Sequence, residues 1–193
     1  SRDECRAARD AAIRRQMLFV SPDYRARTSW MGPAAEADMI QLIQLLKDKH
    51  HVRHVYLCGG SMGGTGALTF AVLHPDLIAG VASMNGTANL VEYRNFQEAI
   101  RASFGGDQQA VPDEYRKRSA ELFVEKLTMP IGLTTGGQDT AVPPASVLRM
   151  ASRLKELNRR VELIHRESGG HETNYADATQ ILNFVLPPVS ETP

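Results

Sequence analysis

The chain has 193 residues, 42% of them hydrophobic, and its 22 Lys and Arg balance its 22 Asp and Glu at a formal net charge of zero. Its length allows one domain with a sizeable core, and its neutrality argues against nucleic acid or an anionic membrane as the main partner, because both attract basic surfaces. No apolar stretch approaches the roughly 20 residues of a membrane span, and two cysteines indicate neither a disulfide framework nor a metal site.

Apolar runs alternate with helical periodicities along the chain. The first run, MLFVS at 17–21, is typical of a strand buried on both faces. Strands are predicted at 17–21, 52–58, 77–84, 129–135 and 161–165. Helices are predicted at 1–16, 34–49, 64–73, 93–104, 114–126, 145–157 and 174–186. This order requires right-handed crossovers, so we expect an α/β fold, a three-layer sandwich with a mostly parallel sheet.

Residues 1–193 show no internal repeat, low-complexity segment or linker, and they are expected to form a single domain. Within it, the less regular segment 85–128 is predicted to form a small helical cap. The helix at 1–16 starts at the first residue with no strand before it, so we expect the domain to be incomplete at its N-terminus. The compartment is unknown from composition; the cytoplasm is the default expectation, which a signal peptide lost with upstream residues would change.

Four glycines surround one serine in VYLCGGSMGGTGALTF, residues 55–70. A phosphate-binding loop is one explanation, but the nearest match to G-x-G-x-x-G lacks its third glycine, and the lysine of a P-loop is missing. The other explanation is a nucleophile elbow, because G-x-S-x-G stands here between a predicted strand and a predicted helix. Side chains at Gly59 and Gly63 would crowd that sharp turn. The elbow lifts the Ser61 hydroxyl clear of the sheet, and the N–H of Met62 can donate to a developing oxyanion.

A serine hydroxyl attacks a carbonyl at neutral pH when an imidazole takes its proton and a carboxylate orients that imidazole. His171, in SGGHET, lies in the loop between the last predicted strand and the last helix. Asp139, in TGGQDTAVP, directly follows the fourth predicted strand. These loops meet at the carboxyl edge of a parallel sheet, and the order Ser61, Asp139, His171 is that expected of an α/β-hydrolase.

The segments GGSMGGTGAL, TGGQDTAVP and SGGHET resemble the nucleophile, acid and histidine segments of the α/β-hydrolase superfamily, in particular of small serine esterases and prolyl-oligopeptidase-like hydrolases. The resemblance runs from about residue 17 to 186. It implies an eight-stranded sheet, of which this chain would hold the later five strands, and acyl transfer through a serine ester with no cofactor. It also implies a second oxyanion donor from a loop after an early strand, often marked His-Gly, and we expect the segment that carries this loop to lie upstream of residue 1.

We expect an enzyme that hydrolyses small-molecule carboxylic esters through an acyl-enzyme on Ser61. One alternative is a prolyl-oligopeptidase-like serine peptidase, which the absence of a large accessory domain disfavours. The other is a non-catalytic interaction protein of the hydrolase fold, which the missing oxyanion loop favours. Trp30, Asn85 and Tyr93 follow the first and third predicted strands and are candidates for substrate binding, although aromatic residues at such positions serve equally often in packing.

His50, His51 and His54 cluster between a predicted helix and the following strand. They lie away from the catalytic edge and are interpreted as surface residues, so no metal is expected. The strands that a missing front half would leave exposed need covering, which makes a homodimer the expected assembly.

Overall fold

The structure, a computed structural model, describes residues 2–23 and 25–189. Its sheet has four parallel strands that lie side by side in chain order, each predicted from the sequence to within a few residues. They are β1 (Tyr56–Gly60), β2 (Gly80–Met84), β3 (Ile131–Gly136) and β4 (Val161–Arg166). The helices are α1 (Asp3–Arg14), α2 (Pro33–His50), α3 (Met62–Leu73), α4 (Gln97–Phe104), α5 (Pro112–Lys117), α6 (Ala145–Glu156) and α7 (Tyr175–Val185), with short 3₁₀ turns η1 (Pro75–Leu77) and η2 (Ala120–Lys126).

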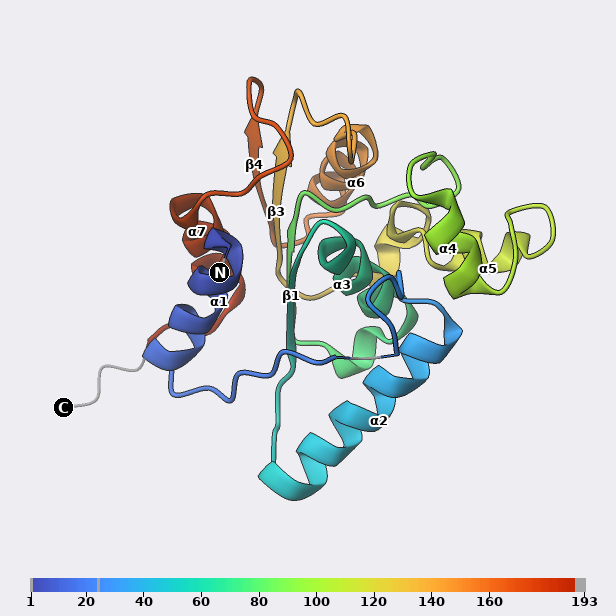
Figure 1. Ribbon diagram of the computed structural model, residues 1–193. Helices are drawn as coiled ribbons and strands as arrows, with labels where there is room; N and C mark the ends of the chain where they lie inside the picture. Colours follow the sequence, from blue (N-terminus) through green and yellow to red (C-terminus); the bar gives the residue numbers. More distant parts are fainter. Residues whose placement is uncertain (1, 24, 190–193) are drawn as a thin grey trace.

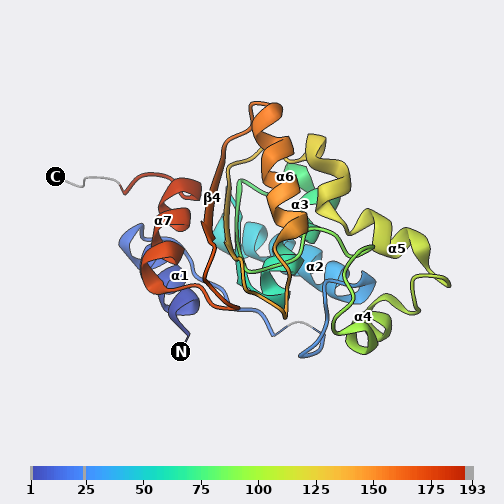
Figure 2. The same cartoon turned by 90° about the horizontal axis from the view of Figure 1, so that it is seen from above.

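Helices cover both faces of the sheet, so the expected three-layer α/β architecture is confirmed. Helices α1 and α7 pack together on one face, and α3, α6 and α2 lie on the other (Figures 1 and 2). The chain crosses from β1 to β2 through α3 and from β3 to β4 through α6. Successive strands are neighbours and all pair in parallel, so the four carboxyl ends point to one edge of the sheet.

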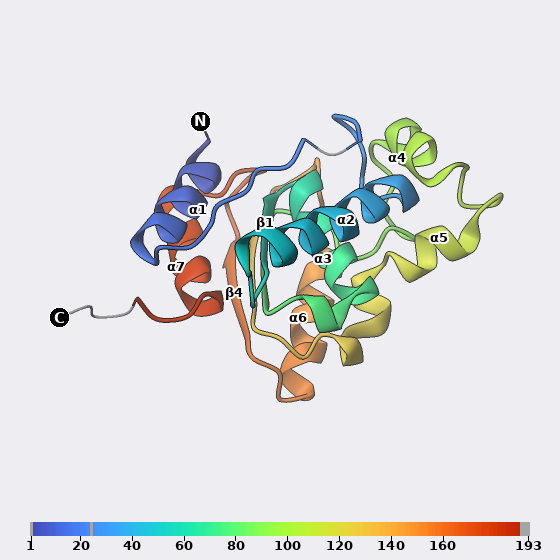
Figure 3. The same ribbon diagram turned by 90° about the horizontal axis from the view of Figure 1, so that it is seen from below.

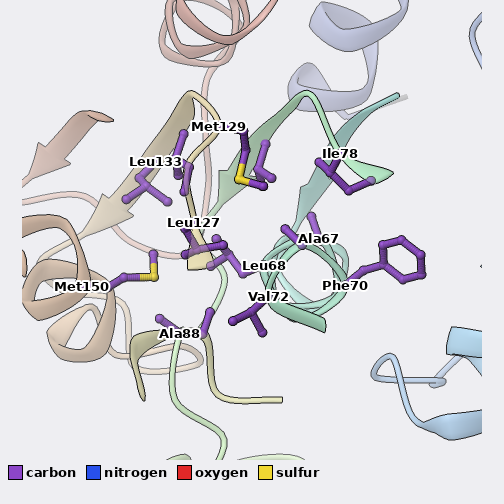
Figure 4. Packing of buried hydrophobic residues seen from close by; sticks show 14 of the residues in the cluster. Ala67, Leu68, Phe70, Val72, Ile78, Ala88, Leu127, Met129, Leu133 and Met150 are labelled. Atoms are coloured by element: carbon purple, nitrogen blue, oxygen red, sulfur yellow. The ribbon is translucent and has the colours of Figure 1, made fainter. Parts of the chain in front are cut away.

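The larger core fills the space between the sheet and α3. Leu68 and Leu133 are completely buried there, and Met150 reaches in from α6 (Figure 4). Both central strands, β2 and β3, are buried along their whole length, as expected for parallel strands covered on both faces. A smaller core lies between the sheet and the α1–α7 pair, where small alanines let the two helices approach closely.

The strand predicted at 17–21 is wrong. This segment passes β1 on its way from α1 toward α2, without any backbone hydrogen bond to β1 among the described residues (Figure 3). Leu18 and Phe19 are 54% and 45% exposed. A groove of about 580 Å³, lined by both segments, separates them. Apolar sequence favours burial, but a strand also needs a neighbouring strand within hydrogen-bonding reach, and here none is present.

Helix α2 crosses beneath α3 (Figure 3) and is tied to the 85–128 segment by a buried charge. Arg118, which is fully buried, donates to Glu36 at 2.6 Å and pairs with Glu114 at 3.2 Å. His74, at the end of α3, bonds the other oxygen of Glu36 at 2.8 Å. These contacts attach α5 to the domain, while α4 and α5 lie at one side, away from the sheet (Figure 1).

Candidate active site

The predicted elbow is formed at the carboxyl end of β1. Ser61 has φ 54° and ψ −118°, a strained combination for a residue with a side chain, and its backbone N–H donates to the Met84 carbonyl at 2.7 Å. A Cβ at Gly59 would lie 2.3 Å from the backbone carbon of Gly63, so this glycine is required. Gly63 itself is not crowded, contrary to expectation, because its own Cβ would point into open space.

Ser61, His171 and Asp139 form one continuous hydrogen-bonded chain. The Nε2 atom of His171 lies 2.8 Å from the Ser61 Oγ, and its Nδ1 lies 2.7 Å from Oδ2 of Asp139. Because a carboxylate can only accept, Nδ1 carries the proton and Nε2 accepts from the serine hydroxyl. The sequence separations are 110 and 32 residues, so it is the fold that assembles this geometry.

The Asp139 carboxylate is held from both sides. Its side chain is 1% exposed, and Oδ1 accepts from the backbone N–H groups of Ala141 and Val142 at 2.9 and 2.8 Å. These bonds satisfy Oδ1, while Oδ2 faces His171, so both oxygens of the buried carboxylate have partners. The loop also docks on the histidine loop through Gln138, whose N–H donates to the Gly169 carbonyl at 2.9 Å.

The ends of the histidine loop are fixed by an ion pair. Arg166, at the end of β4, contacts Asp177 in the first turn of α7 through two hydrogen bonds of 2.5 and 3.0 Å. The hydrogen bond from Arg166 lowers the pKa of Asp177 below its ordinary value. Asn174 caps the same helix by accepting from the Asp177 N–H at 2.9 Å. His171 therefore sits on a short span anchored at both ends.

The three residues predicted to bind substrate, Trp30, Asn85 and Tyr93, are all buried. Trp30 packs in tilted arrangements against Tyr93 and the exposed Phe96, with ring centroids 5.7 and 5.8 Å apart. The Tyr93 hydroxyl donates to the Ala141 carbonyl at 2.8 Å, and burial, with the nearby Asp139 charge, raises the pKa of Tyr93. This aromatic cluster therefore packs against the acid loop and is hydrogen-bonded to it through Tyr93.

Asn85 is 4% exposed and faces the acid and histidine loops, not solvent. Sequence reasoning placed it in a loop but missed its partners Thr134 and Thr173, which carry no motif, and also Asn95, whose amide donates to the Ala141 carbonyl at 2.8 Å. No sequence pattern marks these three residues. They come together at the carboxyl edge only when the strands are aligned in the fold.

Met62 is the first residue of α3, a position whose backbone N–H has no partner within the helix. It therefore lies where the predicted oxyanion donor is needed. Across the described residues there is no group of three or more His, Cys, Asp or Glu side chains arranged to hold a metal ion. Within the same residues, no helix is both long and apolar enough to cross a membrane.

Residues 24–186 match the family model described as the prolyl oligopeptidase family. The chain belongs to the prolyl oligopeptidase family. This assignment confirms the predicted resemblance to the α/β-hydrolase superfamily and to its prolyl-oligopeptidase-like members. The match covers the elbow, the acid loop and the histidine loop together.

Relatives of this prolyl oligopeptidase family member are longer proteins. An uncharacterized peptidase YtmA of Bacillus subtilis (strain 168) is 24% identical over 131 residues, which cover 65% of this chain and 51% of that protein. A puromycin-hydrolyzing peptidase of Mycobacterium tuberculosis superposes with a TM-score of 0.67 at 22% identity, over 81% of this chain and 24% of its own. For the acylaminoacyl peptidase of Pyrococcus horikoshii the TM-score is 0.62 at 18% identity, over 80% and 27% of the two chains. The chain thus spans about half of the curated relative and about a quarter of these structures.

Proposed function

We propose that the protein is a serine peptidase in which Ser61 is the nucleophile, His171 the general base and Asp139 the acid that orients the imidazole. The observation that carries this proposal is the unbroken chain from Ser61 Oγ through His171 to Asp139, with links of 2.8 and 2.7 Å. Such an arrangement activates a hydroxyl that is otherwise a poor nucleophile. Membership of the prolyl oligopeptidase family supports the same assignment.

The reaction begins when Ser61 Oγ attacks the scissile carbonyl and its proton passes to His171 Nε2. The negative charge that develops on the carbonyl oxygen accepts a hydrogen bond from the Met62 N–H. His171 then gives its proton to the leaving amine, and the acyl group stays on Ser61 as an ester. Water, deprotonated by His171, attacks this ester and releases the acid, while Asp139 remains ionised throughout.

Two considerations favour a peptide bond over a small ester as the substrate. The named relatives are peptidases, and the absence of a large accessory domain from residues 1–193 does not argue against a peptidase, because the chain spans about a quarter of those structures. The same triad also cleaves activated esters, whose better leaving group needs less help from the general acid. Carboxylesterase activity is therefore a side reaction in this proposal.

The aromatic cluster of Trp30, Tyr93 and Phe96 is proposed as one wall of the substrate site. It packs against Met62, the residue after the nucleophile, so its surface borders the position that the acyl group must occupy. Phe96 is 55% exposed and gives this wall an apolar face toward solvent. In this proposal, the helices of segment 85–128 form the small cap that carries the wall.

Labelling with a fluorophosphonate probe tests the nucleophile, with Ser61→Ala as the negative control. Substrate class is then tested with a matched pair, an aminoacyl p-nitroanilide and the p-nitrophenyl ester of the same amino acid. A peptidase cleaves both, whereas an esterase cleaves the ester and leaves the anilide intact. A folded protein that takes no label and cleaves neither compound supports the non-catalytic alternative and refutes the proposal.

A further inference from the structure

Asn85 lies at the carboxyl edge of the sheet, and its side chain reaches both the acid loop and the histidine loop. It directly follows β2, and its backbone N–H continues the sheet ladder by donating to the Thr134 carbonyl at 2.9 Å. Its φ of 50° lies in the left-handed region, which asparagine tolerates better than most residues. With this backbone conformation, the Asn85 side chain lies between the acid loop and the histidine loop.

The amide nitrogen of Asn85 joins the two loops. Nδ2 lies 3.4 Å from Oδ2 of Asp139 and 3.2 Å from the carbonyl oxygen of Gly170, the residue before His171. Both partners can only accept, which fixes the orientation of the amide. Oδ2 is also the oxygen that accepts from His171, so Asn85 supplies its second donor.

The amide oxygen of Asn85 is held just as firmly. It faces the hydroxyls of Thr134, at 3.1 Å, and of Thr173, at short range, and these two hydroxyls lie 2.6 Å from each other. The two threonine hydroxyls have only two protons between them, so two of these three contacts at most are hydrogen bonds at one time. The threonines come from β3 and from the end of the histidine loop, so both ends of the amide connect the same two parts of the chain.

The loops that Asn85 joins also approach each other closely. A Cβ at Gly136 would lie 2.2 Å from the Gly170 carbonyl oxygen, so little space separates the end of β3 from the segment before His171. A lateral shift of either loop would therefore move the imidazole relative to the carboxylate. The geometry that carries catalysis depends on this contact.

We propose that Asn85 is a positioning residue, which locks the Asp139 carboxylate and the His171 loop into the register required for proton transfer. It acts through those two residues and does not touch the reacting atoms. This inference rests on the proposed function, because it assigns Asn85 a part in the same reaction. It also gives Asn85 a different role from the substrate contact expected from sequence.

Asn89 provides a matched control on the same loop. It is equally buried, and its side chain caps the backbone N–H groups of Val91 and Glu92 and donates to Glu121 at 2.8 Å. None of its hydrogen bonds reaches the triad. Asn89→Ala therefore removes a buried amide of the same size without releasing either catalytic loop.

Steady-state kinetics on the anilide or ester distinguish positioning from a structural role. We expect Asn85→Ala to lower kcat about 10- to 100-fold with KM within about twofold, since a small displacement of aligned groups costs this much. Thr173→Val removes one partner of the Asn85 oxygen and should lower kcat in the same direction by less. Asn89→Ala should lower the melting temperature and leave kcat near the wild-type value.

Proton NMR gives a readout that does not require turnover. A proton shared between His171 Nδ1 and Asp139 resonates far downfield, and we expect Asn85→Ala to shift or broaden this signal while Asn89→Ala keeps it. An unchanged kcat and resonance in Asn85→Ala, or equal losses in Asn89→Ala, overturn the inference. If Asn85→Ala does not fold, Thr173→Val decides by the same criteria. If the wild type takes no fluorophosphonate, the proposed function fails, and the resonance still decides the role of Asn85.

Discussion

The carboxyl edge of the sheet and its lateral edge at β1 differ in which side chains are buried and which are exposed. At the carboxyl edge, buried polar side chains have several hydrogen-bond partners: the Asp139 carboxylate accepts from two backbone N–H groups of its own loop and from His171 of the histidine loop. Along β1, apolar side chains such as Leu18 and Phe19 face solvent across a groove, and in the part of the chain that the structure describes no strand pairs with this edge. Buried polar groups are tolerated where partners are complete; exposed apolar groups show where packing is not complete.

The contrast explains which regions can be changed at little cost. Every partner at the carboxyl edge is specific in distance and direction, so a single substitution leaves a buried group unpaired. Along the groove beside β1 a substitution removes few contacts.

Asp139→Asn replaces a carboxylate of the carboxyl edge that has several hydrogen-bond partners. The amide keeps the volume but favours the wrong imidazole tautomer, so we expect kcat/KM to fall about 10⁴-fold with the fold intact. Hydrolysis of the ester substrate, alongside circular dichroism, measures both. A loss below about tenfold would mean that another group orients His171.

Leu133→Ala and Phe19→Ala compare the two regions directly in stability. Leu133 is fully buried on β3, and its truncation should lower the free energy of unfolding by about 2–5 kcal/mol. Phe19 is 45% exposed beside β1, and surface truncations usually stay within about 0.5 kcal/mol. Urea unfolding of both variants gives the two values. Comparable losses would show that the groove is closed by packing in solution.

The Arg166–Asp177 pair should give a smaller, pH-dependent effect. Since the pKa of Asp177 is lowered in the folded state, its stabilisation is fully present above the ordinary pKa of about 4 and is lost as the pH falls through the folded value. We expect Asp177→Asn to cost about 1 kcal/mol at pH 7, because Arg166 is largely exposed, and to converge with the wild type near pH 2.

Urea unfolding at pH 7, 5 and 3 measures this convergence. Glu156→Gln serves as the control, because it breaks an ion pair with Arg153 whose two side chains are both exposed. Its cost should be near zero at every pH. A wild-type advantage over Asp177→Asn that grows below pH 4 would contradict the predicted sign.

The smallest effect is expected on self-association. If the homodimer predicted from sequence forms through the β1 edge, a charge at Phe19 should weaken it, because lysine opposes edge-to-edge contact. Sedimentation velocity across a hundredfold range of concentration, about 1–100 µM, compares Phe19→Lys with the wild type. Leu122→Lys is the control, an exposed leucine on η2 outside the groove. Equal behaviour of all three proteins would place any dimer elsewhere.

Much of the carboxyl edge could be predicted from sequence because its signals are local. Ser61 is marked by flanking glycines, and Asp139 and His171 by glycine-rich loops directly after strands. The failures depend on contacts made at a distance. The run at 17–21 is apolar enough for a strand, yet pairing depends on a neighbour, which its own residues cannot specify. Asn85 could be placed in its loop, but the acid and histidine loops that it joins come together only through the register of β2, β3 and β4.

The backbone conformation of Ser61 places the proposed activity and thermal stability in opposition. A positive φ with a negative ψ is comfortable for glycine and costly for serine, at about 1–3 kcal/mol. Ser61→Gly would relieve that strain while deleting the hydroxyl. A laboratory selection for heat resistance alone would therefore favour the more stable and inactive glycine variant. Retention of serine at this elbow would then indicate that turnover is also selected.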